Sequence, residues 1–150
     1  MDDVRSYDDG IVGYFIEDLS VGMSASFQKT VTEADIVLFA GVSGDTNPVH
    51  INEEYAKKTF FKGRIAHGML GAAYISTVLG TRMPGPGAVY VSQNLRFRAP
   101  VRAGDTVTAR VTVAEIVLEK GRALMNTMVT VGDTVVIEGD ATVSLPTRGD

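Results

Sequence analysis

The stretch HGMLGAAYISTVLGTR, residues 67–82, decides the prediction of the fold. From Met69 to Leu79, its apolar and small residues cover nearly the whole circumference of a helix, with the hydroxyls of Ser76 and Thr77 between them. A helix that is apolar all round is typical of a buried element. The sequence therefore predicts a central buried helix, which ends before the Pro-Gly-Pro-Gly run at residues 84–87.

The residues after this helix show the alternation of strands. Apolar and polar side chains alternate, with short turns between the segments, over residues 89–98, 106–117, 123–131 and 135–145. Short turns join antiparallel neighbours, so we expect a meander of about four antiparallel strands. One buried helix and an antiparallel sheet predict an α+β fold, with the sheet curled around the helix.

The residues before the helix predict a strand, a helix and a loop. Residues 24–32 read as a strand, and Thr32 followed by Asp35 is typical of a helix N-terminus. This first helix should end between residues 41 and 44. Residues 45–52 then read as a loop stiffened by Pro48, and residues 53–60 as a short helix.

Length and composition limit the classes of protein. A chain of 150 residues with 45% hydrophobic content fits one domain, which we place at residues 15–147 after a flexible extension at 1–14. The net charge of −4 argues against general nucleic-acid binding. No apolar run is long enough for a membrane span and the N-terminus is acidic, so we expect a cytoplasmic protein without a membrane partner.

Cofactor chemistry also receives little support from the composition. The chain has no cysteine, which removes thiolate metal sites and cysteine nucleophiles. Its two histidines do not form a ligand cluster in the sequence, so we predict no metal. The Pro-Gly-Pro-Gly run is not a phosphate-binding loop, because its prolines lack the amides that such a loop needs.

The loop DTNPVH, residues 45–50, carries the strongest candidates for chemistry. Asp45 and His50 place a carboxylate and an imidazole on one stiff turn, and such a pair can share proton transfer near neutral pH. Taken singly, Asp45 is also typical of a turn or cap, His50 of a partly buried histidine, and Asn47 of a turn before proline. The combination favours the catalytic interpretation.

This loop and the sequence IAHGM, residues 65–69, together resemble the MaoC-like hydratase family in its (R)-specific enoyl-CoA hydratase branch. The resemblance extends from about Phe15 to Pro146. It implies a single hot-dog fold, in which a sheet wraps a long helix, and a homodimer. It also implies a hydro-lyase that adds water reversibly and syn to trans-2-enoyl-CoA, giving (R)-3-hydroxyacyl-CoA. Such an activity belongs to fatty acid metabolism and to the supply of polyhydroxyalkanoate precursors, and needs no cofactor beyond the coenzyme A of its substrate.

The resemblance also implies roles for individual residues. Asp45 and His50 would activate the water and protonate the α-carbon, with Asn47 orienting the pair. The backbone N–H of Gly68 would bind the thioester oxygen, as the first amide of a helix is suited to do. Ser76 would support the site, for example by bonding the catalytic aspartate; the alternative is a serine that bonds its own helix backbone. His67 is interpreted as structural rather than catalytic.

The ligand and the rival functions stay open at this point. Ile75 and Leu79 should border an acyl pocket, and Arg64 and Arg98 are the basic residues chosen for the coenzyme A phosphates. A hot-dog thioesterase would instead direct water at the carbonyl carbon. A noncatalytic hot-dog module would bind acyl thioesters without turnover. Acyl length, carrier (coenzyme A or acyl carrier protein) and reaction direction are not decided by the sequence.

Overall fold

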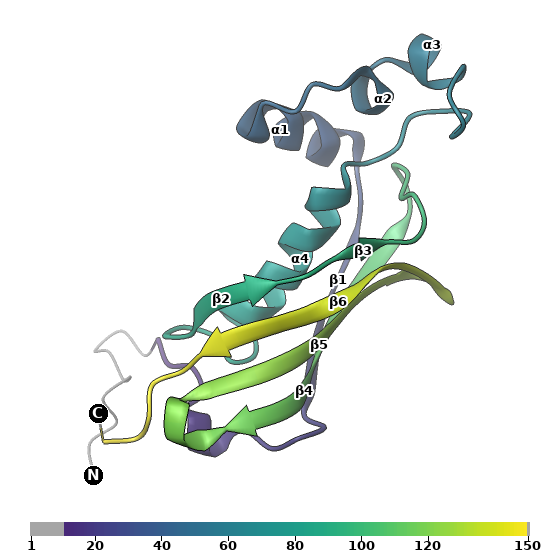
Figure 1. Cartoon of the computed structure of the whole chain (residues 1–150). Coiled ribbons are helices and arrows are strands. Elements are labelled where there is room, and N and C mark those ends of the chain that lie inside the picture. The colour runs from purple at the N-terminus through teal and green to yellow at the C-terminus, as the bar shows by residue number, and fades with distance from the viewer. Residues whose placement is uncertain (1–10, 150) are drawn as a thin grey trace.

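The computed structural model describes residues 11–149 and has one antiparallel sheet, one long helix and a group of short helices (Figure 1). The long helix α4 lies against one face of the sheet, and α1, α2 and α3 lie beyond its N-terminal end. The helices are α1 Glu33–Ser43, α2 Pro48–Ile51, α3 Glu53–Ala56 and α4 Gly68–Thr81, with 3-10 turns at Ile16–Asp18 and Leu118–Lys120. The predicted α+β class is confirmed.

The sheet has the strand order β1-β4-β5-β6-β2, and the short β3 also pairs with β6. The strands are β1 Ser24–Thr30, β2 Val89–Gln93, β3 Arg96–Phe97, β4 Thr106–Val117, β5 Arg122–Val131 and β6 Thr134–Ser144. The alternation along β4 is confirmed, because Val107, Ala109, Val111 and Val113 are all buried. Their side chains face α4 and form the core with it.

The segment predicted as one strand over residues 89–98 is divided into β2 and β3. Asn94 lies between them and faces β6, where its N–H donates to the Asp140 carbonyl at 2.9 Å. The Asn94 side-chain oxygen accepts from the Asp140 N–H at 3.2 Å. Asn94 therefore keeps the divided strand attached to β6, and the chain after α4 forms five strands, β2 to β6, where about four were expected.

Helix α4 buries one face only, so the prediction of burial all round is wrong. Leu70, Ile75 and Val78 are buried against the sheet. Met69 and Ser76 lie on the opposite, exposed face. The outer face also carries Ala73 and Gly80. Small residues look apolar in a sequence pattern, but they have little side-chain surface, so leaving them exposed to water costs little.

The start and end of α1 agree with the sequence. Thr32 caps the helix by accepting a hydrogen bond from the Asp35 N–H at 3.0 Å, and Asp35 accepts from the Thr32 N–H at 2.9 Å. These bonds lower the pKa of the Asp35 carboxyl, with the Thr32 N–H as the largest cause. Gly44 ends the helix in the left-handed conformation, with φ of 79°.

The loop predicted over residues 45–52 is in part helical. Asn47 caps the one-turn helix α2 by accepting from the Val49 N–H at 3.1 Å, and Pro48 is its first residue. Proline suits this position because its missing N–H would have had no helical partner.

Most of the predicted extension, residues 1–10, lies outside the described residues. In residues 11–149 no helix is long and apolar enough to cross a bilayer.

Candidate active site

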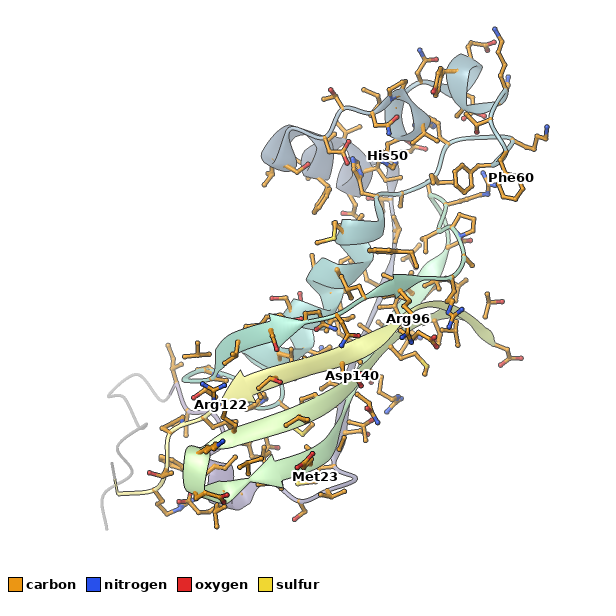
Figure 2. All side chains as sticks on the ribbon, viewed as in Figure 1. Met23, His50, Phe60, Arg96, Arg122 and Asp140 are labelled. Carbon is orange, nitrogen blue, oxygen red and sulfur yellow. The ribbon has the colours of Figure 1, made fainter. Side chains whose placement is uncertain are left out.

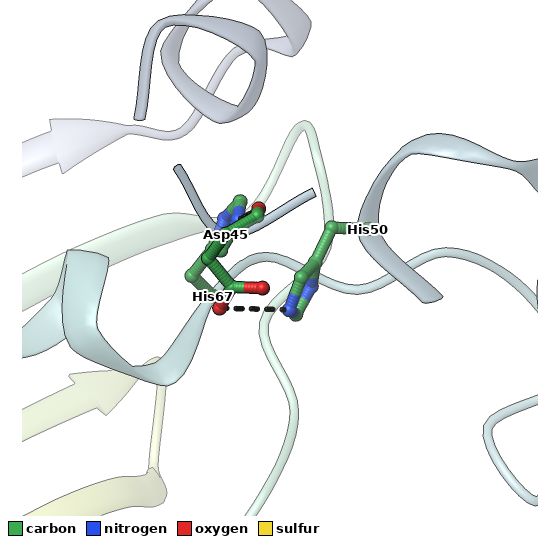
Figure 3. A group of neighbouring side chains, drawn as sticks. All are labelled: Asp45, His50 and His67. Atoms are coloured by element: carbon green, nitrogen blue, oxygen red, sulfur yellow. Dashed lines mark hydrogen bonds and ion pairs between the residues drawn. The ribbon is translucent and has the colours of Figure 1, made fainter. Parts of the chain in front are cut away.

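His50 is buried, with 7% of its surface exposed, and its ring has a defined orientation. Its Nδ1 lies 2.9 Å from the Ile65 carbonyl oxygen. Because a carbonyl only accepts hydrogen bonds, Nδ1 carries the proton of the neutral ring. Nε2 then presents a lone pair, and it faces Asp45 (Figure 3). His50 is therefore arranged to accept a proton at Nε2.

Asp45 lies opposite this lone pair and remains accessible. Its Oδ2 is 3.9 Å from His50 Nε2, and half of its side chain (51%) is exposed. A separation beyond direct hydrogen-bond length is suited to a small polar molecule that contacts both groups. The main-chain N–H of Asp45 donates to Ser43 Oγ at 3.1 Å, which fixes the start of the loop.

Asn47 contacts both members of the pair through its main chain. Its N–H donates to Asp45 Oδ1 at 3.2 Å, and its carbonyl accepts from the His50 N–H at 2.9 Å. The side chain is used differently, because it caps α2. The residue therefore orients the pair by its position in the turn and not by a side-chain bond to either partner.

His67 lies beside the pair and is more deeply buried, with 3% exposed. Its ring stacks on that of His50 at 3.8 Å between centroids, and Phe39 packs against it at 4.9 Å. Its Nε2 donates to the Asp45 carbonyl at 2.8 Å. His67 Nδ1 has no hydrogen-bond partner in the described structure. His67 thus joins the main chain of Asp45 to the ring of His50.

Asp45, His50 and His67 offer three potential metal-ligand atoms within 4.8 Å of one another. The two rings are stacked, with an angle of 27° between their planes. Ring-nitrogen lone pairs lie in the ring plane, so those of stacked rings run side by side and do not converge on one tetrahedral ion. This geometry fits proton transfer better than zinc coordination, and the absence of a resident metal stays a prediction.

Gly68 follows His67 and begins α4. No backbone hydrogen bond described for the chain uses its N–H, as expected for the first residue of a helix. A Cβ at this position would lie 2.7 Å from the Phe97 ring, so any other residue would have to displace that exposed ring from the helix start. Gly68 is exposed next to His67, and its amide lies at the positive end of the helix dipole.

An apolar cavity of about 490 Å³ opens beside Gly68. His67 and Gly68 line one end of it. Its other walls come from the turn after α3, the residues that follow β3, and the sheet. Lining residues include Phe61, Gly71, Tyr74, Phe97 and Ile137. Burial raises the pKa of the Tyr74 phenol to about 12, with the negative charge of Asp35 as a smaller cause.

The other residues implied by the resemblance lie away from the pair. Ser76 is exposed, and the described hydrogen bonds of Asp45 do not include it. It is eight residues beyond Gly68, about 12 Å along the helix. The proposed bond between Ser76 and Asp45 is therefore not formed. Ile75 and Leu79 are 0% and 2% exposed, belong to the core, and do not line the cavity.

The two chosen arginines already have carboxylate partners. Arg64 binds both oxygens of Glu33 at 2.8 Å and Glu53 at 3.1 Å, which ties α1, α3 and the segment before α4 together. The Glu33 hydrogen bonds raise the pKa of the Arg64 guanidinium. Arg98 bonds Glu138 through Nε at 2.9 Å. Any phosphate bound by these arginines would therefore share the guanidinium with a carboxylate or replace it.

Figure 2 shows His50 and Phe60 among the short helices beyond the N-terminal end of α4. His50 belongs to α2, and Phe60 to the turn after α3. The sequence did not indicate that Phe61, Phe97 and Ile137 share one cavity, because they lie on three separate segments. The contact of His67 with the pair was also missed. The adjacency of His67 and Gly68 in the second motif was the available signal.

Comparison with known proteins identifies relatives over nearly the whole chain. The chain is 62% identical to an (R)-specific enoyl-CoA hydratase of Rhodospirillum rubrum, over 96% of this chain and 99% of that protein. It is 50% identical to a 3-hydroxybutyryl-CoA dehydratase of Methylorubrum extorquens, over 89% and 85%. The structure of an (R)-hydratase from Aeromonas caviae involved in polyhydroxyalkanoate biosynthesis superposes with a TM-score of 0.83, at 39% identity, covering 87% of this chain and 99% of that one.

An unliganded R-hydratase of Pseudomonas aeruginosa gives a TM-score of 0.84 at 42% identity, covering 91% of this chain and 88% of that one. These hydratase structures support the expected hot-dog fold. The model of the MaoC like domain matches residues 19–136, which is most of the chain. On sequence, fold and the placement of its two motifs, this chain belongs to the MaoC-like domain family.

Proposed function

We propose that the protein is an (R)-specific enoyl-CoA hydratase, a hydro-lyase that interconverts trans-2-enoyl-CoA and (R)-3-hydroxyacyl-CoA. The supporting observation is the pairing of His50 Nε2 with Asp45 Oδ2 beside His67, which together with Gly68 lines one end of an apolar cavity. The identity to (R)-specific enoyl-CoA hydratases over nearly the whole chain supports the same activity.

In the hydration direction, the substrate water binds between Asp45 and His50. The pair removes one proton from it as the water oxygen bonds to the β-carbon. The electrons of the carbon–carbon double bond move to the thioester oxygen, where the Gly68 N–H stabilises the negative charge. The pair then returns a proton to the α-carbon from the same face. The net change is the addition of H and OH, so the mechanism needs no further reactant and no cofactor.

The geometry favours this reaction over a thioesterase. A thioesterase would direct its water at the carbonyl carbon. In the proposed mechanism the pair, 3.9 Å apart, instead holds one water for the β-carbon, and the Gly68 N–H binds the carbonyl oxygen. A noncatalytic module would not need an oriented histidine whose Nδ1 is fixed by the Ile65 carbonyl. The loop at residues 45–50 and the identity to hydratases and a dehydratase support hydration as well.

The test follows crotonyl-CoA by its enoyl absorbance, with thiol release measured in parallel and the product analysed on a chiral column. We expect loss of enoyl absorbance without thiol release, and the (R) alcohol as product. In D₂O the product should carry one deuterium at the α-carbon. Thiol release would identify a thioesterase, and binding without any turnover would identify a noncatalytic module.

We propose further that His67 positions the pair. Replacing His67 by Phe keeps the aromatic stack but removes the hydrogen bond to the Asp45 carbonyl, and should lower kcat about tenfold with little change in KM. Replacing His67 by Gln places an N–H donor near the former Nε2 and should restore most of kcat. Steady-state kinetics and the Tm of both variants check this. If kcat and Tm fall together in both, the role is only structural.

The unpaired edge of the sheet supports a homodimer. β2 is the last strand in the sheet order, and its Val89 and Val91 are exposed. An exposed apolar edge strand is suited to pair with another strand, and here we propose the β2 of a second copy. Light scattering should give twice the chain mass. A Val89→Lys, Val91→Lys variant should be monomeric, whereas Val21→Lys, at an exposed position before the opposite edge, should stay dimeric.

A further inference from the structure

The side chain of Phe97 lies at the start of α4 and has no role in the reaction steps described above. Phe97 is directly opposite Ile137 in the pairing of β3 with β6, so both side chains point to the face of the sheet that carries α4. Ile137 is 3% exposed, whereas Phe97 is 54% exposed. Phe97 therefore contributes much less to the core than its neighbour does.

Two glycines of α4 make room for these two side chains. A Cβ on Gly68 would lie 2.7 Å from the Phe97 ring, and a Cβ on Gly71 would lie 2.6 Å from Ile137 Cδ1. Gly68 and Gly71 are three residues apart, so they lie on one face of the helix. The three atoms nearest to a Cβ of Gly68 all belong to the Phe97 ring. The start of α4 thus rests directly on this ring.

The ring lies on the side of Gly68 toward which its amide points. In a helix the Cα–Cβ bonds tilt toward the N-terminus, and the N–H groups of the first turn point in the same direction. An oxygen that accepts from the Gly68 N–H would therefore lie beside Phe97. The strand is held in place next to the ring, because the Arg98 N–H donates to the Val136 carbonyl at 2.8 Å and the Arg98 side chain bonds Glu138.

We propose that the Phe97 ring keeps bulk water from the Gly68 N–H and from the thioester oxygen bound to it. This inference rests on the proposed function. Gly68 is exposed, and an amide that water reaches is a weak donor to a developing charge, because water competes for the bond and screens the charge. A hydrocarbon ring in that place offers no competing hydrogen bond. Phe97 is thus a positioning residue that acts through the Gly68 amide.

Phe97→Ala should lower kcat/KM for crotonyl-CoA at least about tenfold, mostly through kcat, because the charge on the thioester oxygen develops in the transition state. Phe97→Leu keeps an apolar cover and should restore most of the rate. Leu118→Ala is the control, since Leu118 is also 54% exposed, lies in the turn between β4 and β5, and does not line the cavity. It should leave kcat/KM unchanged. A folded Phe97→Ala variant with normal kcat would contradict the proposal.

Gly68→Ala tests the same contact with the ring retained. The variant keeps the N–H, but its methyl needs the space of the Phe97 ring and should push the ring aside. Its loss of kcat should match that of Phe97→Ala, and the double variant should be slower than either single variant by no more than about twofold. Losses that multiply in the double variant would mean that ring and amide act independently, and the proposal would be wrong.

An infrared measurement keeps this inference separate from the proposed reaction. Butyryl-CoA is saturated and cannot be hydrated, and a ¹³C label marks the stretching band of its thioester carbonyl. On the unaltered protein this band should move to lower wavenumber than in water, and in Phe97→Ala it should return toward its position in water. This pattern without enoyl turnover would overturn the hydratase function but keep the role of Phe97. Normal turnover, with the same band position in both proteins, would do the reverse.

Discussion

Asp45→Asn and His50→Ala are each expected to lower kcat for enoyl-CoA hydration by at least two orders of magnitude. Asn at position 45 keeps the size and an acceptor for the Asn47 N–H, but it cannot take a proton from water. Alanine at position 50 removes Nε2 and the bond from Nδ1 to the Ile65 carbonyl. Both members contact the same water in the proposed step, so the loss in the double variant should be much less than the product of the two. Stopped-flow or steady-state kinetics with crotonyl-CoA measures this.

The control for these variants is Asp133→Asn, which makes the same chemical change in an exposed turn between β5 and β6. It should leave kcat unchanged. Circular dichroism and the Tm should show that each active-site variant is folded. Nearly normal turnover in folded Asp45→Asn and His50→Ala would remove the pair from the mechanism.

Gly139→Ala is expected to destabilise the fold, although alanine normally suits a strand better than glycine does. Gly139 lies in β6. It faces Asn94, in the short segment that joins β2 to β3. A Cβ there would overlap the main-chain carbonyl oxygen of Asn94 and lie 2.9 Å from its carbon. A main-chain group cannot rotate away as a side chain can, so the pairing around Asn94 must shift. Overpacking of this kind costs about 1 to 3 kcal/mol in the free energy of unfolding.

Urea denaturation measures this loss, and Gly41→Ala provides the comparison. Gly41 lies within α1, and a Cβ there meets no atom within 4 Å. Alanine should therefore raise stability by up to about 1 kcal/mol through helix propensity. The two substitutions are chemically identical and should act in opposite directions. Equal stability of the Gly139 variant and the unaltered protein would show that the sheet adapts at Asn94.

The local elements could be predicted from the sequence because neighbouring residues determine them. The cap at Thr32 and the end of α1 at Gly44 depend on backbone geometry within a few residues. The alternation along β4 reports which side chains face the core. The one-turn helix at Pro48 was missed because four residues are too short for any helical period.

The candidate site was predictable in part for the same reason. Asp45 and His50 are five residues apart on one turn, so their meeting is a local event. A bond between Ser76 and Asp45, one of the two roles considered for Ser76, would join distant segments, and the hydrogen bonds described for Asp45 do not include it.

The sequence by itself determined the α+β class, most of the element boundaries and the closeness of Asp45 to His50, because each depends on contacts between near neighbours. Only the tertiary structure decided that His67 stacks on His50, that one face of α4 is exposed, and that Gly71 and Ile137 close on one cavity. These contacts join segments far apart in the chain. The packing of α4 on the sheet sets them, and no periodicity in the sequence carries that information.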